Sequence, residues 1–345
     1  MDKKVDSLTR LMQSMQNRRE FLKSFGKGVG YTALVGVLPA CGGSSDDNDD
    51  PPPSPVIPPK PALPAASREY STLKRISFGP HRDELVAIQN LGIDTYIEQQ
   101  LDHLSISDGT LEADIQSLFP LTFQTPLQLL AGFPDNIFSV ATQMISATQY
   151  RQMFSNRQLY EVMVEFWTDH FNIHLINGLG PTLKPADDLQ VIRQHALGNF
   201  KDLLHASAKS TAMLFYLDNF LNQSVAPNEN YARELMELHT LGVDGGYTED
   251  DIKEVARCFT GWTLRLPGDP MGDYGDFNFV AAIHDDLAKT VLGNPIAAGG
   301  GQSDGEQVLD LLAAHPSTAR FIATKLCRRF ISDDPAPATA STVAG

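Results

Sequence analysis

The stretch that most constrains the fold runs from residue 228 to 262 and reads NENYARELMELHTLGVDGGYTEDDIKEVARCFTGW. Its pattern predicts two helices joined by a glycine-containing turn, the first beginning near Asn228 and ending at Gly242. Thr248 precedes three acidic residues, which is typical of the N-cap of a second helix. We expect a chain organised around such a pair to be mainly α-helical.

The first predicted helix has two distinct faces. Its apolar stripe is formed by Tyr231, Leu235 and Leu238. Its charged residues stand four apart on another face and are Glu229, Arg233 and Glu237. Residues four apart are neighbours on a helix surface, so this ladder can be an ordinary set of salt bridges or one wall of a polar site.

Several segments of this stretch resemble the signature of the bacterial family known as domain of unknown function 1800. The resemblance is carried by the sequence from Asn228 to Leu235, the Leu241-Gly242 turn, Tyr247-Thr248-Glu249 and Thr260-Gly261-Trp262. It is echoed by Phe166-Trp167-Thr168-Asp169-His170-Phe171 and by His284-Asp285 with Lys289 and Gly293. The family brings no established activity. Its members tend to be encoded beside another exported family, which implies an exported protein partner.

Hydrophobic periodicity elsewhere also favours helices. Apolar residues recur at helical spacing after Pro80 as far as Gly92, from Ile137 to Tyr150, and twice between Ser303 and Ile331. The pattern alternates instead in Thr263–Leu266 and Phe277–Val280, which predicts a β-hairpin. We therefore expect a mainly α, multi-helical, bundle-like domain with a small β-hairpin after the central helix pair.

Two histidines suggest a metal site. We expect one helix to run from Arg157 through His174, which would place His170 and His174 on one face at the spacing of helix-borne metal ligands. The stretch reads His-Phe-Asn-Ile-His, so the glutamate of a zinc protease motif is missing. The alternative, which we favour, is that these are partly buried histidines bonded to carbonyls or acids.

A catalytic hypothesis follows from combining these groups. Glu229, Arg233 and Glu237 would line one cavity together with His170 and His174. His284 and Asp285, which follow the second strand of the hairpin, would complete it. Carboxylates and histidines can bind a divalent metal and activate water, or divide acid and base roles. This predicts metal-assisted hydrolysis. The alternative is a non-catalytic surface binding or assembly protein whose polar motifs are structural.

The N-terminus resembles an export signal. Arg18 and Arg19 begin a twin-arginine pattern, an apolar run follows, and Leu38-Pro39-Ala40-Cys41 resembles a lipoprotein cleavage box. Cys41 would then carry a lipid that anchors the protein in a membrane. Gly42, rather than an acidic residue, favours the outer membrane. We expect residues 1–41 to be the signal peptide and 42–66 to be a Pro- and Asp-rich disordered tether.

The net charge of the chain disfavours one class of binding partner. The formal net charge of −15 disfavours nucleic acid, because an acidic surface repels the phosphate backbone. The helical domain is expected at 67–332 and a disordered tail at 333–345. Relatives normally continue with more helices, so the resemblance implies a domain that is incomplete at its C-terminus. Cys258 and Cys327 are expected to be small buried thiols.

Overall fold

A computed structural model describes residues 66–344. The expected signal peptide, the expected lipidation site Cys41 and the expected tether up to residue 65 lie outside this range. The described chain is mainly helical with two small antiparallel hairpins, which confirms the expected fold class. None of its helices is both long and apolar enough to span a bilayer.

Three short helices open the domain and share one small core. They are α3 (Arg68–Ile76), α4 (Arg82–Leu91) and α5 (Ile93–Leu101). Leu73, Ile88 and Tyr96 are buried together there. Gly92 separates α4 from α5 with a φ of 84°, a conformation that glycine adopts without the steric penalty of a side chain. The helix predicted to follow Pro80 and stop at Gly92 is therefore confirmed.

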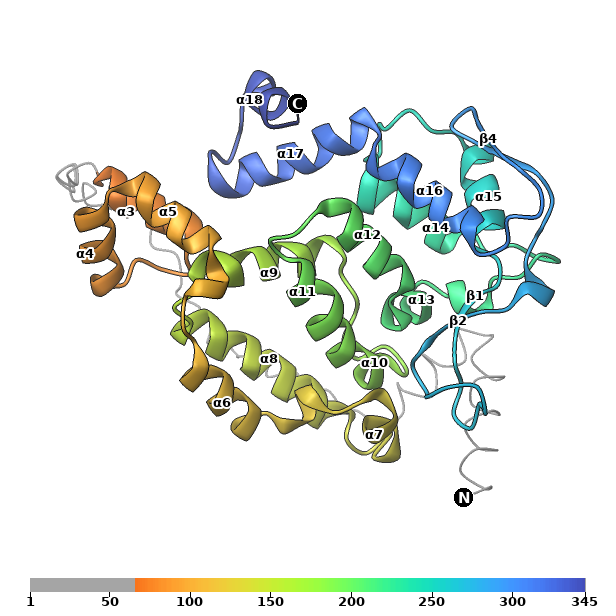
Figure 1. The fold of residues 1–345 in the computed structure, drawn as a ribbon, viewed down its shortest axis with the longest axis horizontal. Helices are drawn as coiled ribbons and strands as arrows, with labels where there is room; N and C mark the ends of the chain where they lie inside the picture. The colour runs from red at the N-terminus through yellow and green to blue at the C-terminus, as the bar shows by residue number, and fades with distance from the viewer. Residues whose placement is uncertain (1–65, 345) are drawn as a thin grey trace, which may run out of the picture. The chain divides into compact units, whose positions relative to one another are not determined.

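The middle of the chain forms a layer of helices (Figure 1). Its elements are η1 (His103–Ser105), α6 (Gly109–Leu118), η2 (Pro120–Phe123), α7 (Pro126–Ala131), α8 (Ile137–Phe154), α9 (Gln158–His170), α10 (Gly180–Asp187), η3 (Asp188–Ile192), α11 (Arg193–His195), α12 (Phe200–Lys209), α13 (Thr211–Tyr216) and η4 (Asn219–Leu221). α9 is buried along most of its length and ends at His170.

The central helix pair exists, but its first helix changes type. α14 (Asn230–Glu234) continues as a π-helix, η5 (Leu235–Thr240), and the second helix is α15 (Glu249–Cys258). The wider π turn shifts the buried face, so that His239 follows Leu235 into the core. Leu238, expected in the apolar stripe, is instead exposed.

The expected hairpin is present and a second one follows it. β1 (Trp262–Leu264) pairs with β2 (Phe277–Phe279), with Trp262 opposite Phe279. After η6 (Ala281–Ile283), β3 (Lys289–Val291) pairs with β4 (Asn294–Ile296). The alternating pattern of three-residue strands is too short to predict the second pair from sequence. β3 packs on α15, so the segment that follows the first hairpin lies against the second helix of the central pair.

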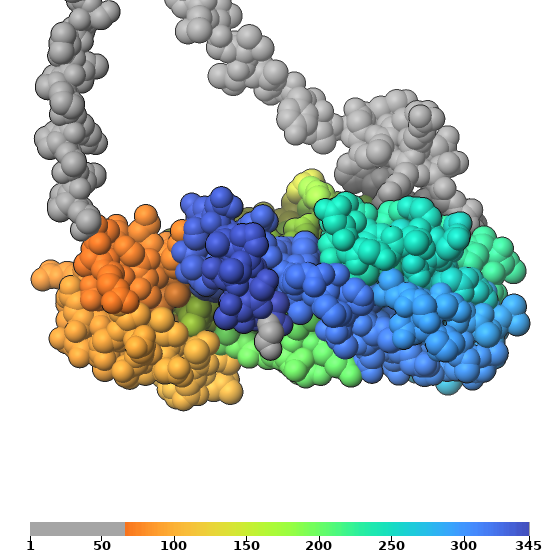
Figure 2. Space-filling model, turned by 90° about the horizontal axis from the view of Figure 1, so that it is seen from above, coloured from red at the N-terminus to blue at the C-terminus, as the bar shows by residue number. Residues whose placement is uncertain are grey.

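Three helices close the described chain: α16 (Ser303–Ala313), α17 (Pro316–Phe330) and α18 (Pro337–Ala344). α18 lies where the sequence predicts a disordered tail, and it packs on α17 (Figure 1). Alanine favours helix, proline is tolerated in the first turn, and Ala340 is buried against its neighbours. Figure 2 shows α17 and α18 in dark blue beside the orange N-terminal helices, where Arg75 forms an ion pair with Asp333.

Candidate functional site

A cleft of about 390 Å³ lies where α9, α13, the central helix and α17 meet, and we call it the Lys325 cleft. Its lining combines polar and apolar residues from segments far apart in sequence. The lining residues are Asp169, His170, Asn172, Tyr216, Leu217, Glu234, Leu238, His239, Phe321 and Lys325. This volume falls at the small end of the range for ligand sites in proteins.

The π turn in the central helix determines how His170 is held. Leu241 N–H bonds to Met236 O, and the Thr240 hydroxyl donates to Leu235 O, both five residues back. The carbonyl of His239 instead accepts a hydrogen bond from Nε2 of His170 at 2.9 Å. A carbonyl can only accept, so His170 carries its proton on Nε2 and presents Nδ1 as an acceptor.

Lys325 forms a hydrogen bond with that acceptor nitrogen. Its Nζ lies 2.7 Å from Nδ1 of His170 and 5.3 Å from the ring centre of Phe321, one helical turn earlier on α17. Among the described lysines, only Lys74 and Lys325 have no carboxylate within ion-pair distance, and Lys74 is exposed. The paired lysines are Lys184, Lys201, Lys209, Lys253 and Lys289.

Burial shifts the pKa values of the ionisable side chains in the cleft. Burial lowers the pKa of Lys325, although the carboxylate of Asp169 opposes this. Burial, with the nearby Lys325 charge, lowers the pKa of His170 well below its ordinary value and that of His239 to about 3. Burial also raises the pKa of Glu234, with a further contribution from Glu237. The pKa values of Lys325 and Glu234 therefore both move towards neutral pH.

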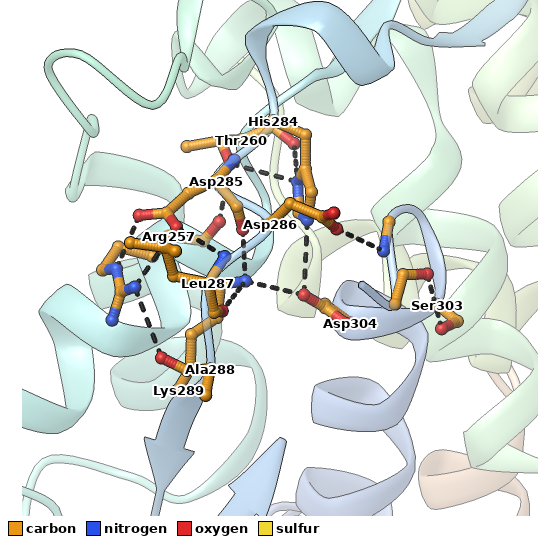
Figure 3. A network of polar contacts seen from close by, with 12 residues as sticks. Arg257, Thr260, His284, Asp285, Asp286, Leu287, Ala288, Lys289, Ser303 and Asp304 are labelled. Atoms are coloured by element: carbon orange, nitrogen blue, oxygen red, sulfur yellow. Dashed lines mark hydrogen bonds and ion pairs between the residues drawn. The ribbon is translucent and has the colours of Figure 1, made fainter. Parts of the chain in front are cut away.

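A second polar cluster, which we call the Asp304 network, lies at the exit of the first hairpin (Figure 3). Asp304 and Lys289 are fully buried, and Lys289 Nζ lies 2.7 Å from Oδ2 of Asp304. Lys289 also donates to the carbonyls of Asp285 and Leu287. All three ammonium protons of Lys289 thus have partners inside the protein.

His284 completes the Asp304 network. Its Nδ1 lies 2.8 Å from the backbone carbonyl of Thr260, so Nδ1 carries a proton. The Thr260 hydroxyl donates to the carbonyl of Arg257 and accepts from the N–H of Asp285. These contacts tie the hairpin exit to the end of α15. Nε2 of His284 lies 3.3 Å from Oδ2 of Asp304, so both ring nitrogens of this buried histidine have partners inside the protein.

The ladder predicted on the central helix is a surface ion-pair cluster. Arg233 lies 2.7 Å from Glu249 and 3.4 Å from Glu229, and about two fifths of the Arg233 and Glu229 side chains are exposed. Glu237 is also partly exposed, and none of these residues lines the Lys325 cleft. The ladder is therefore not assembled with the histidines.

The other predicted site residues also lie in separate parts of the structure. His170 lies in the Lys325 cleft, whereas His284 and Asp285 belong to the Asp304 network, where Asp285 pairs with Arg257 at 2.7 Å. His174 lies beyond the end of α9 and is exposed. The prediction of one helix carrying both histidines was wrong, because α9 ends at His170 and the chain then leaves the helix.

The residues present do not fit the expected divalent metal. Both ring nitrogens of His170 already have partners. Within residues 66–344, no three side chains of His, Cys, Asp or Glu are grouped so that they could hold an ion. Cys258 and Cys327 are both buried and free, as expected.

Sequence reasoning missed most of the cleft. Asp169 and Glu234 lie inside the motif segments that carry the family resemblance, so their position there was an available signal. Lys325 gave no such signal, because one lysine in an amphipathic helix is usually solvated. His239 was missed because its burial depends on the π turn.

Comparison with known proteins places the chain among proteins of one family. A family model described as "Protein of unknown function (DUF1800)" matches residues 71–345. No curated protein and no solved structure matches the chain.

Proposed function

Because the chain belongs to the DUF1800 family, we propose a function from its geometry: an exported, lipid-anchored enzyme that uses acid–base catalysis in the Lys325 cleft. The export and anchoring parts rest on the twin-arginine pattern and on Cys41. The catalytic part rests on the described residues. It keeps the enzymatic hypothesis drawn from the sequence but moves its centre to Lys325 and Glu234.

The observation that carries the proposal is the hydrogen bond between Lys325 and His170 at the wall of an open cleft. Lys325 is half-buried beside a neutral imidazole and has no carboxylate within ion-pair distance, so its loss of solvation outweighs the more distant charge of Asp169. Such lysines serve as general bases and nucleophiles in enzymes. A lysine that only stabilised the fold would be expected to have a carboxylate partner, as Lys289 does.

Glu234 supplies the complementary acid. It lines the same cleft from the central helix, and burial raises its pKa. General acid–base catalysis is most effective when the pKa values of both groups lie near the working pH. The pKa of Lys325 is lowered and that of Glu234 is raised, so both shift in the direction that this role needs.

The non-catalytic alternative has one specific observation in its favour. The Asp304 network uses His284, Asp285 and Lys289 in internal contacts, as a structural polar network would. This supports a binding or assembly role for that part of the chain. It does not extend to the Lys325 cleft, where Lys325 lines a cavity of about 390 Å³.

Acetylation of lysines at a series of pH values tests the catalytic part. The purified full chain is treated briefly with acetic anhydride, and the rate at each lysine is measured by peptide mass mapping and normalised to its own plateau. We expect the midpoint of Lys325 to lie below that of Lys253, an exposed lysine whose pKa is raised by Asp250. A midpoint at or above that of Lys253 would remove the proposed base.

The anchoring part has a separate test. We expect metabolic labelling with palmitate to mark the parent chain and to place it in the membrane fraction, and we expect Cys41→Ser to lose the label. Changing Arg18 and Arg19 to lysine should keep the chain inside the cell. A soluble, unlabelled parent chain would contradict the anchor and would leave the proposal about the cleft intact.

A further inference from the structure

We propose that Lys325 is a nucleophile that forms an imine with small aldehydes or ketones in the cleft. This inference rests on the proposed function, because it names the substrate class of the same site. It is drawn from how the amine is oriented, what else lines the cleft and how a proton can be carried there.

His170 fixes the direction of the amine. Its Nε2–H donates a hydrogen bond to the carbonyl of His239, so Nδ1 of His170 is an acceptor. Lys325 must therefore be the donor in its hydrogen bond to Nδ1. A neutral amine that donates one N–H to Nδ1 keeps its lone pair directed away from that nitrogen. Lys325 and His170 both line the cleft, so a carbonyl compound bound there would lie beside the amine.

The rest of the lining fits a small carbonyl compound. Leu238 and Phe321 provide apolar surface, and Tyr216 and Asn172 provide groups that can bond to a polar substituent. The volume of about 390 Å³ admits only a small molecule. The carboxyl groups on the lining also disfavour a strongly anionic substrate.

The reaction balances without any oxidant or reductant. The Lys325 lone pair forms a C–N bond to the carbonyl carbon, and the carbonyl oxygen takes the proton of Glu234. The Glu234 carboxylate then removes a proton from the new ammonium nitrogen. Finally the nitrogen lone pair forms the C=N bond, and the hydroxyl leaves as water with the Glu234 proton. The products are an iminium on Lys325, a carboxylate and one water.

Reductive trapping tests this step directly. The purified full chain is incubated at neutral pH with propionaldehyde and sodium cyanoborohydride, and alkylation is followed at each lysine by peptide mass mapping. We expect Lys325 to be alkylated faster than the exposed Lys74, because the lowered pKa of Lys325 leaves more of its amine neutral. Glu234→Gln should slow trapping at Lys325 and leave Lys74 unchanged.

The outcomes separate the two proposals. An acetylation midpoint of Lys325 below that of Lys253, without faster alkylation of Lys325 than of Lys74, would overturn the imine and keep the acid–base function. A midpoint at or above that of Lys253 would overturn both. Lys325→Arg keeps a cation and a donor to His170 but cannot form an imine, so we expect it to lose the labelled peptide while alkylation of Lys74 persists. The parent chain alone already decides between these outcomes, whether or not the variant folds.

Discussion

Nε2 of His284 lies 3.3 Å from Oδ2 of Asp304, and the same oxygen lies 2.7 Å from Nζ of Lys289. Oδ1 of Asp304 has no hydrogen-bond partner among the described residues. One carboxylate oxygen thus balances a fully buried ammonium group. The Asp304 network is therefore expected to matter for folding more than any surface ion pair of the chain.

Asp304→Asn should lower the free energy of unfolding by about 3–5 kcal/mol, because it leaves the buried Lys289 charge without a counter-ion. Urea denaturation of parent and variant measures the difference. Asp250→Asn is the matched control, since Asp250 pairs with Lys253 on the exposed surface and its loss should cost far less stability. Equal losses in the two variants would contradict a structural role for the Asp304 network.

The N-cap of α15 gives a smaller effect. Thr248 Oγ1 accepts the N–H of Asp251, and the Asp251 carboxylate accepts the N–H of Thr248, which completes a capping box. Thr248→Ala should therefore cost about 1 kcal/mol of unfolding free energy. Thermal or urea denaturation would measure it, and Thr248→Ser should keep most of the stability because it retains the hydroxyl. A serine variant as unstable as the alanine variant would count against this cap.

The local features of the central helix pair were predictable from sequence. Thr248 and its acidic neighbours are a short-range signal, and the helix they start is where that signal placed it. The alternating residues around Trp262 and Phe277 predicted the first hairpin equally well. These predictions succeed because caps, turns and periodicity act over a few residues.

The cleft was not predictable in the same way. Lys325 and His170 are 155 positions apart, and their contact depends on how α17 packs across the end of α9. The π turn at Leu235–Thr240 buries His239, whereas ordinary helical spacing wrongly predicted that Leu238 would be buried. His174 was placed on a helix by extrapolating a period beyond the point where the helix ends. Each miss concerns packing between distant segments or a change of helix type.

The charged ladder on the central helix is expected to contribute little. Arg233 and its partners Glu229 and Glu249 are all substantially exposed, and exposed ion pairs contribute at most about 1 kcal/mol. A double-mutant cycle with Arg233→Met and Glu249→Gln should give a coupling energy below that value in urea denaturation. The acetylation profile of Lys325 should not change in either variant. A shift of that profile would mean that the ladder and the cleft act together.

His239 should make stability depend on pH. Its pKa in the folded protein is about 3, against an ordinary value of 6.5, because its ring is buried near Lys325. Between these values the unfolded chain holds one more proton than the folded chain, so the free energy of unfolding falls as the pH is lowered through this window.

The effect of one such group is at most about 1.4 kcal/mol per pH unit, and His170 contributes in the same direction because its pKa is lowered too. We expect His239→Phe to reduce the slope of unfolding free energy against pH between about 4.5 and 6.5 by roughly one proton's worth. The phenyl ring preserves packing on Phe171, and the backbone carbonyl still accepts from His170. Urea denaturation across this range measures the slope.

His174→Gln is the control, because an exposed ring is not buried on folding. A His239→Phe slope equal to that of the parent would show that the buried ring does not resist protonation, and it would weaken the case that burial also depresses the Lys325 amine beside it.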